Sequence, residues 1–497
     1  MKKTMSHNVR SMTLASVGQK ICAFIYFTIL ARYLGPEDVG KYVFTLSFAA
    51  IFVILIDLGL TSVLIREGAR HKDRLEKYIT TILSIKLPLG VFAYVLMILS
   101  VFLLGYGRGV IMMVALAGVT MFFDSMHMTF FGALRANGDL RYESWGMVGS
   151  QVASLILGLL CVQFDLPLVC FIGVFTLSSF LNLVFAIHVV RKKLQISCLP
   201  RFDRSTFIQV RTIAIPFAVA ACAARVYSYV DSIILSKLAG DIAVGIYAIP
   251  YKITFAFQFI PLALIAPLYP VFSRLFKENK RELGDHFVQA VRYLAIIVFP
   301  LAIGLSVLAQ DVIIGIYTVD YADSVLPLRI LLVSLLFSFL GFPVGALLNA
   351  CNRQATQTRI VLGVMLVNIV LNVVYISRFG AVAAASAALV GNMLLTIFGY
   401  CVVVRIITIR QVDFFYMLGK IFLTALVMGV LVWWSAETVS SFVRVLPVVG
   451  TFAMIVDFGI RSFLGILLYV IGLMTFKVVT QEECRRLVFV CFGKKIV

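Results

Sequence analysis

The stretch Ile29-Leu-Ala-Arg-Tyr-Leu-Gly-Pro-Glu-Asp-Val-Gly-Lys-Tyr42 separates two long apolar runs of the chain. Each run has roughly 20 residues, which is the length that a helix needs to cross a hydrocarbon core of ~30 Å. Gly35 and Pro36 end the first helix, because proline cannot continue a helix but suits the first position of the next one. The stretch therefore predicts a transmembrane helical hairpin.

A second copy of this hairpin occurs after a shift of 205 residues. Ile234-Leu-Ser-Lys-Leu-Ala-Gly-Asp-Ile-Ala-Val-Gly-Ile-Tyr247 aligns with the first stretch without a gap, and both turn glycines are kept. The basic residue at the end of the first helix is also kept, since Arg32 aligns with Lys237. Many transporters are built from internal repeats, so the alignment predicts a duplicated helical bundle.

Composition excludes several classes of protein. Of 497 residues, 61% are hydrophobic and 13% are charged, which leaves no stretch that resembles a soluble catalytic domain. The nine cysteines lie mostly inside apolar runs without a CxxC pair, so we expect neither a disulfide framework nor a metal site. The sequence contains no nucleophile elbow or P-loop, and we expect no catalytic residues and no enzyme activity.

Apolar runs of membrane-spanning length predict an all-α integral membrane protein with about fourteen transmembrane helices. The predicted spans are 12–33, 42–65, 79–104, 109–131, 144–163, 168–190, 207–237, 242–272, 287–310, 326–349, 358–377, 381–404, 413–434 and 455–476.

The net charge of +19 follows the connections between these spans. Basic residues gather in the connections at 66–77, 191–211 and 273–292 and in the tail at 477–495, which all fall on one side of the membrane. The positive-inside rule places this side, with both termini, in the cytoplasm. The charges therefore do not indicate nucleic acid; beyond topology, they are suited to anionic lipid headgroups or cytosolic partners.

Four basic residues inside the predicted spans are candidates for substrate binding. Lys20 and Arg225 are 205 residues apart, so they occupy the same position in the two copies, near the middle of their helices. Two cations facing one space would favour a phosphate or another anion, and the alternative is a separate partner for each. Lys252 also lies within a span, and Arg32 lies near an outer helix end. Lys86 and Lys420 are expected to extend toward the cytoplasmic interface.

Three acidic residues are candidates for coupling or gating. Asp231 and Lys252 fall at similar depth on neighbouring helices, which predicts either a structural salt bridge or a carboxylate that takes a coupling proton or cation. Asp57 and Asp124 either face one cavity or bond helix ends. Asn368 and Asn372 share one helix face at a spacing of four residues, which favours a contact between helices over a substrate site.

The sequence resembles a known family at Leu30-Ala-Arg-Tyr-Leu-Gly-Pro-Glu-Asp-Val-Gly-Lys-Tyr42, at Asp57-Leu-Gly-Leu60 and at Arg66-Glu-Gly-Ala69. These motifs are similar to the opening of polysaccharide (O-antigen, capsule, teichoic acid) flippases, which belong to the multidrug/oligosaccharidyl-lipid/polysaccharide exporter superfamily. Asp231 and Val244-Gly-x-Tyr247 match the same pattern. The resemblance covers the chain to about residue 405.

The resemblance implies two pseudosymmetric six-helix lobes and two further helices. The lobes would comprise residues 1–200 and 201–411, and residues 412–497 would hold the last two helices and a cytoplasmic tail. It also implies movement of a polyprenyl-pyrophosphate-linked oligosaccharide from the cytoplasmic to the outer leaflet of a bacterial inner membrane. Transport would proceed by alternating access, coupled to Na⁺ or H⁺ and without another cofactor.

The implied partners are the lipid-linked oligosaccharide, membrane lipids and the polymerase or ligase machinery of polysaccharide synthesis. The alternative function is a cation-coupled multidrug antiporter of the same superfamily, which would favour an acidic cavity. The paired cations Lys20 and Arg225 favour the flippase.

Overall fold

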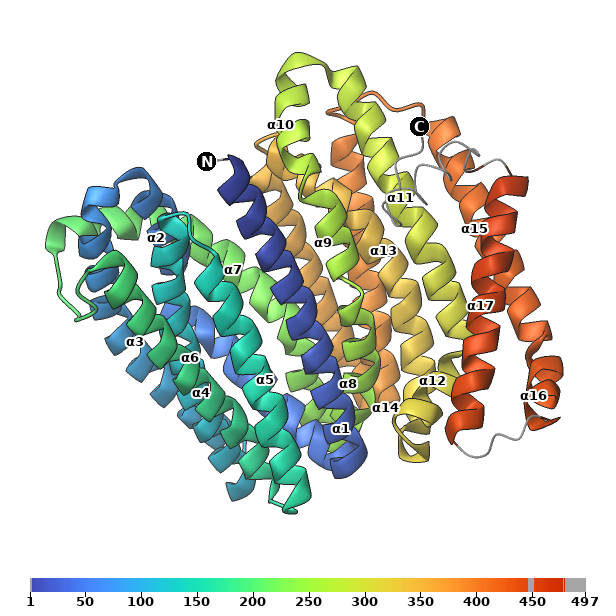
Figure 1. Cartoon of the computed structure of the whole chain (residues 1–497), viewed down its shortest axis with the longest axis horizontal. Coiled ribbons are helices and arrows are strands. Elements are labelled where there is room, and N and C mark those ends of the chain that lie inside the picture. Colours follow the sequence, from blue (N-terminus) through green and yellow to red (C-terminus); the bar gives the residue numbers. More distant parts are fainter. Residues whose placement is uncertain (1, 446–450, 477, 479–497) are drawn as a thin grey trace. The chain divides into compact units, whose positions relative to one another are not determined.

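The computed structural model describes residues 2–445, 451–476 and 478, and it is helical throughout its regular structure (Figure 1). The chain divides into two compact units. Unit 1 comprises Met1–Ala248 and Met365–Ala384, and unit 2 comprises the described parts of Ile249–Val364 and Ala385–Val497. The predicted lobes at 1–200 and 201–411 describe the sequence repeat and stay a prediction.

The first helices of the chain belong to unit 1. They are α1 (Lys2–Asp57), α2 (Leu60–Arg70), the short 3₁₀ helix η1 (Lys72–Arg74), α3 (Leu75–Leu103), α4 (Arg108–Ala136), α5 (Arg141–Gln163), α6 (Leu168–Leu194) and α7 (Arg204–Ala239). Within this unit α4 packs against α6, and α1 packs against α5 and α7.

Helix α8 (Asp241–Ala256) crosses from unit 1 into unit 2, and α14 (Gln354–Val403) belongs to unit 1 only in its middle. The remaining helices belong to unit 2, where α11 packs against α13 and α15. They are α9 (Phe259–Ile265), α10 (Leu268–Glu278), α11 (Lys280–Val307), α12 (Ala309–Ile316), η2 (Val319–Ser324), α13 (Val325–Ala350), α15 (Gln411–Trp434), α16 (Ala436–Val445) and α17 (Thr451–Thr475).

Eleven helices within the described part of the chain are long and apolar enough to cross a membrane, which makes this a multi-pass membrane protein. Two of them contain a glycine with non-helical backbone angles, Gly35 in α1 and Gly380 in α14, and each corresponds to two predicted spans. Helix α7 corresponds to the predicted span 207–237 without being one of the eleven. The all-α membrane fold is confirmed, and the count of fourteen stays a prediction.

The predicted helix breaks occur at equivalent glycines of the two repeat copies. Gly35 has φ 74° and ψ 176°, and Gly240 has φ 83° and ψ 176°. A positive φ is favourable for glycine and costly for other residues, so both turns need the glycine that the sequence provides. The same backbone conformation at positions 205 residues apart supports the repeat.

The two hairpin turns also contact one another inside unit 1. A Cβ atom at Gly40 would clash with the backbone carbonyl of Asp241, and one at Gly245 would clash with that of Pro36. Because Gly40 aligns with Gly245 and Pro36 aligns with Asp241, the contact is reciprocal between the copies. Glycine lets helix backbones approach closely in a membrane protein, and here it joins α1 to α8.

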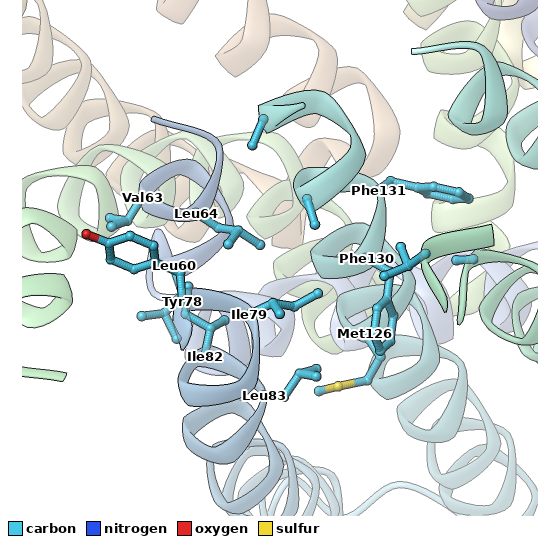
Figure 2. Close-up of a cluster of buried hydrophobic side chains, with 14 of the residues drawn as sticks. Leu60, Val63, Leu64, Tyr78, Ile79, Ile82, Leu83, Met126, Phe130 and Phe131 are labelled. Atoms are coloured by element: carbon cyan, nitrogen blue, oxygen red, sulfur yellow. The ribbon is translucent and has the colours of Figure 1, made fainter. Parts of the chain in front are cut away.

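The apolar core of unit 1 includes a cluster between α2, α3 and α4 (Figure 2). Leu60, Val63 and Leu64 of α2 face Tyr78, Ile79, Ile82 and Leu83 of α3, and Met126, Phe130 and Phe131 come from α4. This core holds α3 beside the end of α1, where the buried Lys86 of α3 is located.

Candidate functional site

Asp231 of α7 is the centre of a buried polar cluster within unit 1. Only 7% of Asp231 is exposed. Its Oδ1 atom accepts a hydrogen bond from Nδ2 of Asn372 at 2.7 Å, and its Oδ2 atom accepts one from the Tyr247 hydroxyl at 3.3 Å. Asn372 also donates to Oδ1 of Asn368 at 3.1 Å. The cluster therefore joins α7, α8 and α14.

The spacing of the two asparagines explains the cluster. Residues four apart lie on one face of a helix, and Asn368 and Asn372 are both almost fully buried on α14. The contact between helices that their spacing predicts is present, since Asn372 reaches α7. The participation of Asp231 was not evident from the sequence, because α7 and the middle of α14 are far apart in the chain.

The electrostatics of the cluster are unusual for a membrane interior. Within the described part of the chain, the groups that hydrogen-bond to Asp231 are neutral, and a buried carboxylate is costly without a compensating charge. The Oδ1 atom of Asn372 is buried and has no hydrogen-bond partner. A carboxylate beside a free amide oxygen presents oxygen atoms of the kind that bind a proton or a hard cation. The predicted pairing of Asp231 with Lys252 stays a prediction.

Asp57, at the end of α1, has a cationic partner. The Lys86 ammonium of α3 lies 2.5 Å from Oδ1 of Asp57, and the Lys86 side chain is fully buried. Lys86 also lies within hydrogen-bond distance of the Thr61 hydroxyl and the Ser125 hydroxyl, at 3.0 and 3.2 Å. The expectation that Lys86 extends toward the interface is wrong, because these partners satisfy its three donors inside the unit.

Asp124 of α4 bonds to neighbouring helix residues. It accepts a hydrogen bond from the Ser179 hydroxyl of α6 at 2.6 Å and lies 3.2 Å from Nε2 of His127. Its side chain is 47% exposed. These contacts fit the interpretation in which Asp57 and Asp124 bond helices; a coupling or gating role for either stays a prediction.

The four candidate anion-binding residues are placed as follows. Lys20 is half-buried on α1, whereas Arg225 on α7, Arg32 on α1 and Lys252 on α8 are exposed. The Arg225 guanidinium lies 5.9 Å from the ring centroid of Tyr229, a distance at which a cation is attracted to an aromatic face. Whether Lys20 and Arg225 face one space stays a prediction.

Sequence reasoning missed a second buried ion cluster, which lies in unit 2. Arg461 of α17 pairs with Asp457 one turn earlier and with Oδ2 of Asp311 on α12, the latter at 3.1 Å. Only 8% of Arg461 is exposed. The spacing of Asp457 and Arg461 by four residues was the available signal.

Comparison with known proteins identifies the family. The model of the family described as "Polysaccharide biosynthesis protein" matches residues 5–276, more than half of the chain. The chain belongs to this family. A second model, MatE, matches residues 216–374, so the protein is a polysaccharide transporter of the multidrug/oligosaccharidyl-lipid/polysaccharide exporter superfamily.

Individual relatives agree with this assignment. The capsular polysaccharide biosynthesis protein CapF of Staphylococcus aureus is 21% identical over 388 residues, which cover 77% of this chain and 94% of CapF. An uncharacterized membrane protein in the cps region of Klebsiella pneumoniae is 21% identical, with 72% of each chain covered.

Solved structures show that this family member shares its fold with flippases and drug transporters. The lipid II flippase MurJ in an inward closed conformation gives a TM-score of 0.71 at 16% identity, covering 93% of this chain and 97% of MurJ. An inward-facing multidrug resistance MATE transporter gives 0.66 at 17% identity, covering 80% and 94%. At these identities the likeness establishes the fold alone.

Proposed function

We propose that this polysaccharide transporter is a flippase that moves a polyprenyl-pyrophosphate-linked oligosaccharide from the cytoplasmic to the outer leaflet of a bacterial inner membrane. The observation that carries the proposal is the match of residues 5–276 to the polysaccharide biosynthesis family. A relative named for capsular polysaccharide biosynthesis and a neighbour named as a lipid II flippase support a lipid-linked substrate. The basic connections support a cytoplasmic location for both termini.

The pyrophosphate is the part of the substrate with the highest free-energy cost of crossing the membrane interior, because it is charged. The protein therefore needs cations that compensate this charge. Lys20 and Arg225 each precede the positive-φ glycine of their copy by fifteen residues, about 22 Å along a helix. The contact between the two turns and this equal spacing support a similar depth for both cations. We assign Lys20 and Arg225 to the pyrophosphate, with Lys252 and Arg32 as further contacts along its path.

Asp231 is the residue that we assign to ion coupling. Its hydrogen-bond donors Asn372 and Tyr247 are neutral, and uptake of Na⁺ or H⁺ would neutralise a negative charge in the membrane interior. Binding of that ion in one conformation more than in the other would drive alternating access, because a ligand shifts an equilibrium only through its differential affinity. Asp57 and Asp124 would then stabilise the bundle during this change.

Deletion of the gene tests the function directly. Surface polysaccharide and lipid-linked oligosaccharide on the cytoplasmic face should be measured together. A flippase predicts loss of the first and accumulation of the second, because polymerases or ligases on the outer face would receive no substrate. Purified protein in vesicles should also move a labelled lipid-linked oligosaccharide between leaflets.

A multidrug antiporter is the second candidate, and the MatE match at 216–374 is the observation that favours it. In that case the deletion strain would keep its surface polysaccharide and become sensitive to cationic drugs. That outcome would contradict the flippase and direct attention to Asp231, Asp57 and Asp124.

The anion site has its own test in the vesicle assay. Lys20→Ala with Arg225→Ala should abolish movement of the pyrophosphate-linked substrate while the protein still inserts and elutes as a folded species. The matched control is Arg74→Ala with Arg108→Ala, which removes the same charge from exposed positions outside the site. Near-normal transport by the first double variant would remove the pyrophosphate assignment and leave the family assignment intact.

A further inference from the structure

Unit 2 contains a large cavity between α11, α15 and the connection that precedes α15. Its volume is about 1050 Å³, and its basic lining residues are Arg281, Arg292, Arg410 and Lys420. Gly284 of α11 lies directly against the carbonyl oxygen of Thr408, so the helix and the connection meet at its edge. Cavities of ~300–1,000 Å³ hold small-molecule ligands, and this one has room for a lipid headgroup.

The basic residues follow one face of each helix. Arg281, Asp285 and Arg292 lie on the face of α11 that lines the cavity, and Asp413 and Lys420 lie on that of α15. With Arg410, the described residues that line the cavity include four cations and two carboxylates. Arg410 approaches Asp413 only at 3.9 Å, and both side chains are more than two-thirds exposed, so this pair neutralises little.

The backbone N–H groups at the start of α11 do not account for anion binding in the cavity. The first N–H groups of α11 are already bonded, because Oδ1 of Asn279 accepts from the backbone nitrogens of Arg281 and Glu282 at 3.1 and 3.2 Å. The attraction for an anion must therefore come from the side chains. Arg292 is held in place, since it donates to the backbone carbonyl of Val478.

Beside its charged residues and the polar residues Gln289 and Thr408, the cavity has an apolar and aromatic part of its wall. It includes Val288 of α11 and Phe414, Tyr416 and Met417 of α15. The Lys420 ammonium lies 4.5 Å from the ring centroid of Tyr416, where the ring attracts it. Free phosphate would gain nothing from such a wall, whereas the first carbons of an acyl chain would pack on it.

The cavity also lies at the right depth for a lipid. Arg281 is the second residue of α11 and Arg410 directly precedes α15, so both are at the end of a membrane-spanning helix. Lys420 is nine residues beyond the start of α15, about 14 Å along the helix. The cations thus extend from the headgroup level into the depth of the acyl chains.

We propose that this cavity binds the phosphate headgroup of an anionic phospholipid, with an acyl chain against Val288 and Met417. Arg281, Arg410 and Lys420 contact the phosphate, and Arg292 supplies charge at the inner end. Basic pockets between transmembrane helices on the cytoplasmic side recognise anionic lipids in this way. The site uses none of the residues that we assign to transport, and its test is a binding measurement.

Native mass spectrometry of the full-length protein would test the site, with phosphatidylglycerol and phosphatidylcholine added in turn. We expect preferential retention of phosphatidylglycerol, weakened roughly 10- to 30-fold by Arg281→Gln with Lys420→Gln. The matched control, Lys277→Gln with Arg353→Gln, removes equal charge from exposed positions outside the cavity and should leave retention unchanged. Equal losses in both double variants would overturn the proposal.

Two competitors separate the possible sources of the phosphate. Displacement of phosphatidylglycerol by millimolar inorganic phosphate would overturn the lipid site in favour of a phosphate site. Displacement by substoichiometric polyprenyl pyrophosphate would overturn it in favour of a substrate site. If the double variant does not fold, Arg281→Gln alone can replace it, because Arg281 is exposed. This single variant should weaken retention of phosphatidylglycerol roughly 3- to 5-fold.

Discussion

Unit 1 contains two acidic side chains, Asp57 of α1 and Asp231 of α7, whose partners differ in charge. Asp57 is 30% exposed at its side chain and has the Lys86 ammonium at 2.5 Å. Asp231 is 7% exposed and accepts hydrogen bonds from the neutral groups of Asn372 and Tyr247. Among the described residues, the first charge is compensated by another charge and the second by neutral dipoles.

The difference in partners separates a carboxylate that stabilises the fold from one that is available for a function. A paired charge already has the partner that offsets its desolvation, so removing that partner is expected to cost stability. A buried carboxylate with neutral donors keeps a negative charge that a proton or cation would relieve. Asp57 joins α1 to α3 through its ion pair with Lys86, whereas ion exchange at Asp231 stays a proposal.

The repeat sharpens this comparison. The residue that aligns with Asp231 in the first copy is Tyr26, and Tyr42 aligns with Tyr247. Both Tyr26 and Tyr42 are buried, and their rings lie 5.6 and 6.1 Å from the ring of Phe175. The first copy thus has an aromatic core at the position where the second copy has a carboxylate.

The largest effect is expected from changing this position in the second copy. Asp231→Asn keeps the shape and a hydrogen-bond acceptor but removes the charge, so ion-coupled transport should fall by roughly 5- to 150-fold, the range of typical coupling free energies. Tyr26→Phe, at the aligned position, should change transport less than about twofold because it removes only a neutral hydroxyl. Vesicle transport with and without an imposed Na⁺ or H⁺ gradient checks both variants. An equal loss of transport in the two variants would contradict a special role of the second copy in ion coupling.

The next effect concerns stability and the paired charge. Lys86→Met leaves Asp57 without its cation and should lower the free energy of unfolding by ~3 kcal/mol, the lower end of the range because Asp57 is partly exposed. Adding Asp57→Leu should recover most of this loss, since the pair is then replaced by apolar groups. Thermal unfolding in detergent measures all three proteins. If the double variant is no more stable than Lys86→Met, the pair does not account for the loss.

A smaller effect should be the same in both copies. Gly40→Ala and Gly245→Ala each place a Cβ against a backbone carbonyl of the other hairpin, so each should cost ~1–3 kcal/mol. Gly18→Ala is the control, because a Cβ there meets nothing within 4 Å and alanine favours a helix. Unfolding temperatures of the three variants provide the measurement. A large difference between Gly40→Ala and Gly245→Ala would contradict the reciprocal contact.

The smallest effect is a pH dependence at the start of the second copy. The hydroxyls of Ser205 and Thr206 and the Thr206 N–H lower the pKa of the Asp203 carboxyl to about 2. Since this folded pKa lies below the usual value of about 4, the cap stabilises α7 at higher pH and is lost as pH falls from about 4 to about 2.

Amide exchange at Thr206 would report the loss of this cap, because the N–H of Thr206 donates to Asp203 at 2.8 Å. Protection should decline across that pH range in the wild type and stay level in Asp203→Asn. Parallel curves for the two proteins would show that the carboxylate charge does not stabilise the helix end.

The sequence by itself determined the helical hairpins and their duplication. Apolar runs of bilayer length leave a helix as the way to satisfy the backbone, and Gly35 and Gly240 mark the points where the chain must turn. These signals are local, because each depends on residues within a few turns of one another. The resemblance to the polysaccharide flippases also rests on local motifs of this kind.

Only the tertiary structure decided which polar groups meet. Asn372 reaches Asp231 across 141 residues and Lys86 reaches Asp57 across 29, and the sequence prediction for Lys86 failed. A lysine near a helix end can extend to the interface or turn inward, and the choice depends on whether a neighbouring helix presents a carboxylate at that depth. Helix packing determines that depth and orientation, and for this reason the partners of the buried charges emerged from the fold.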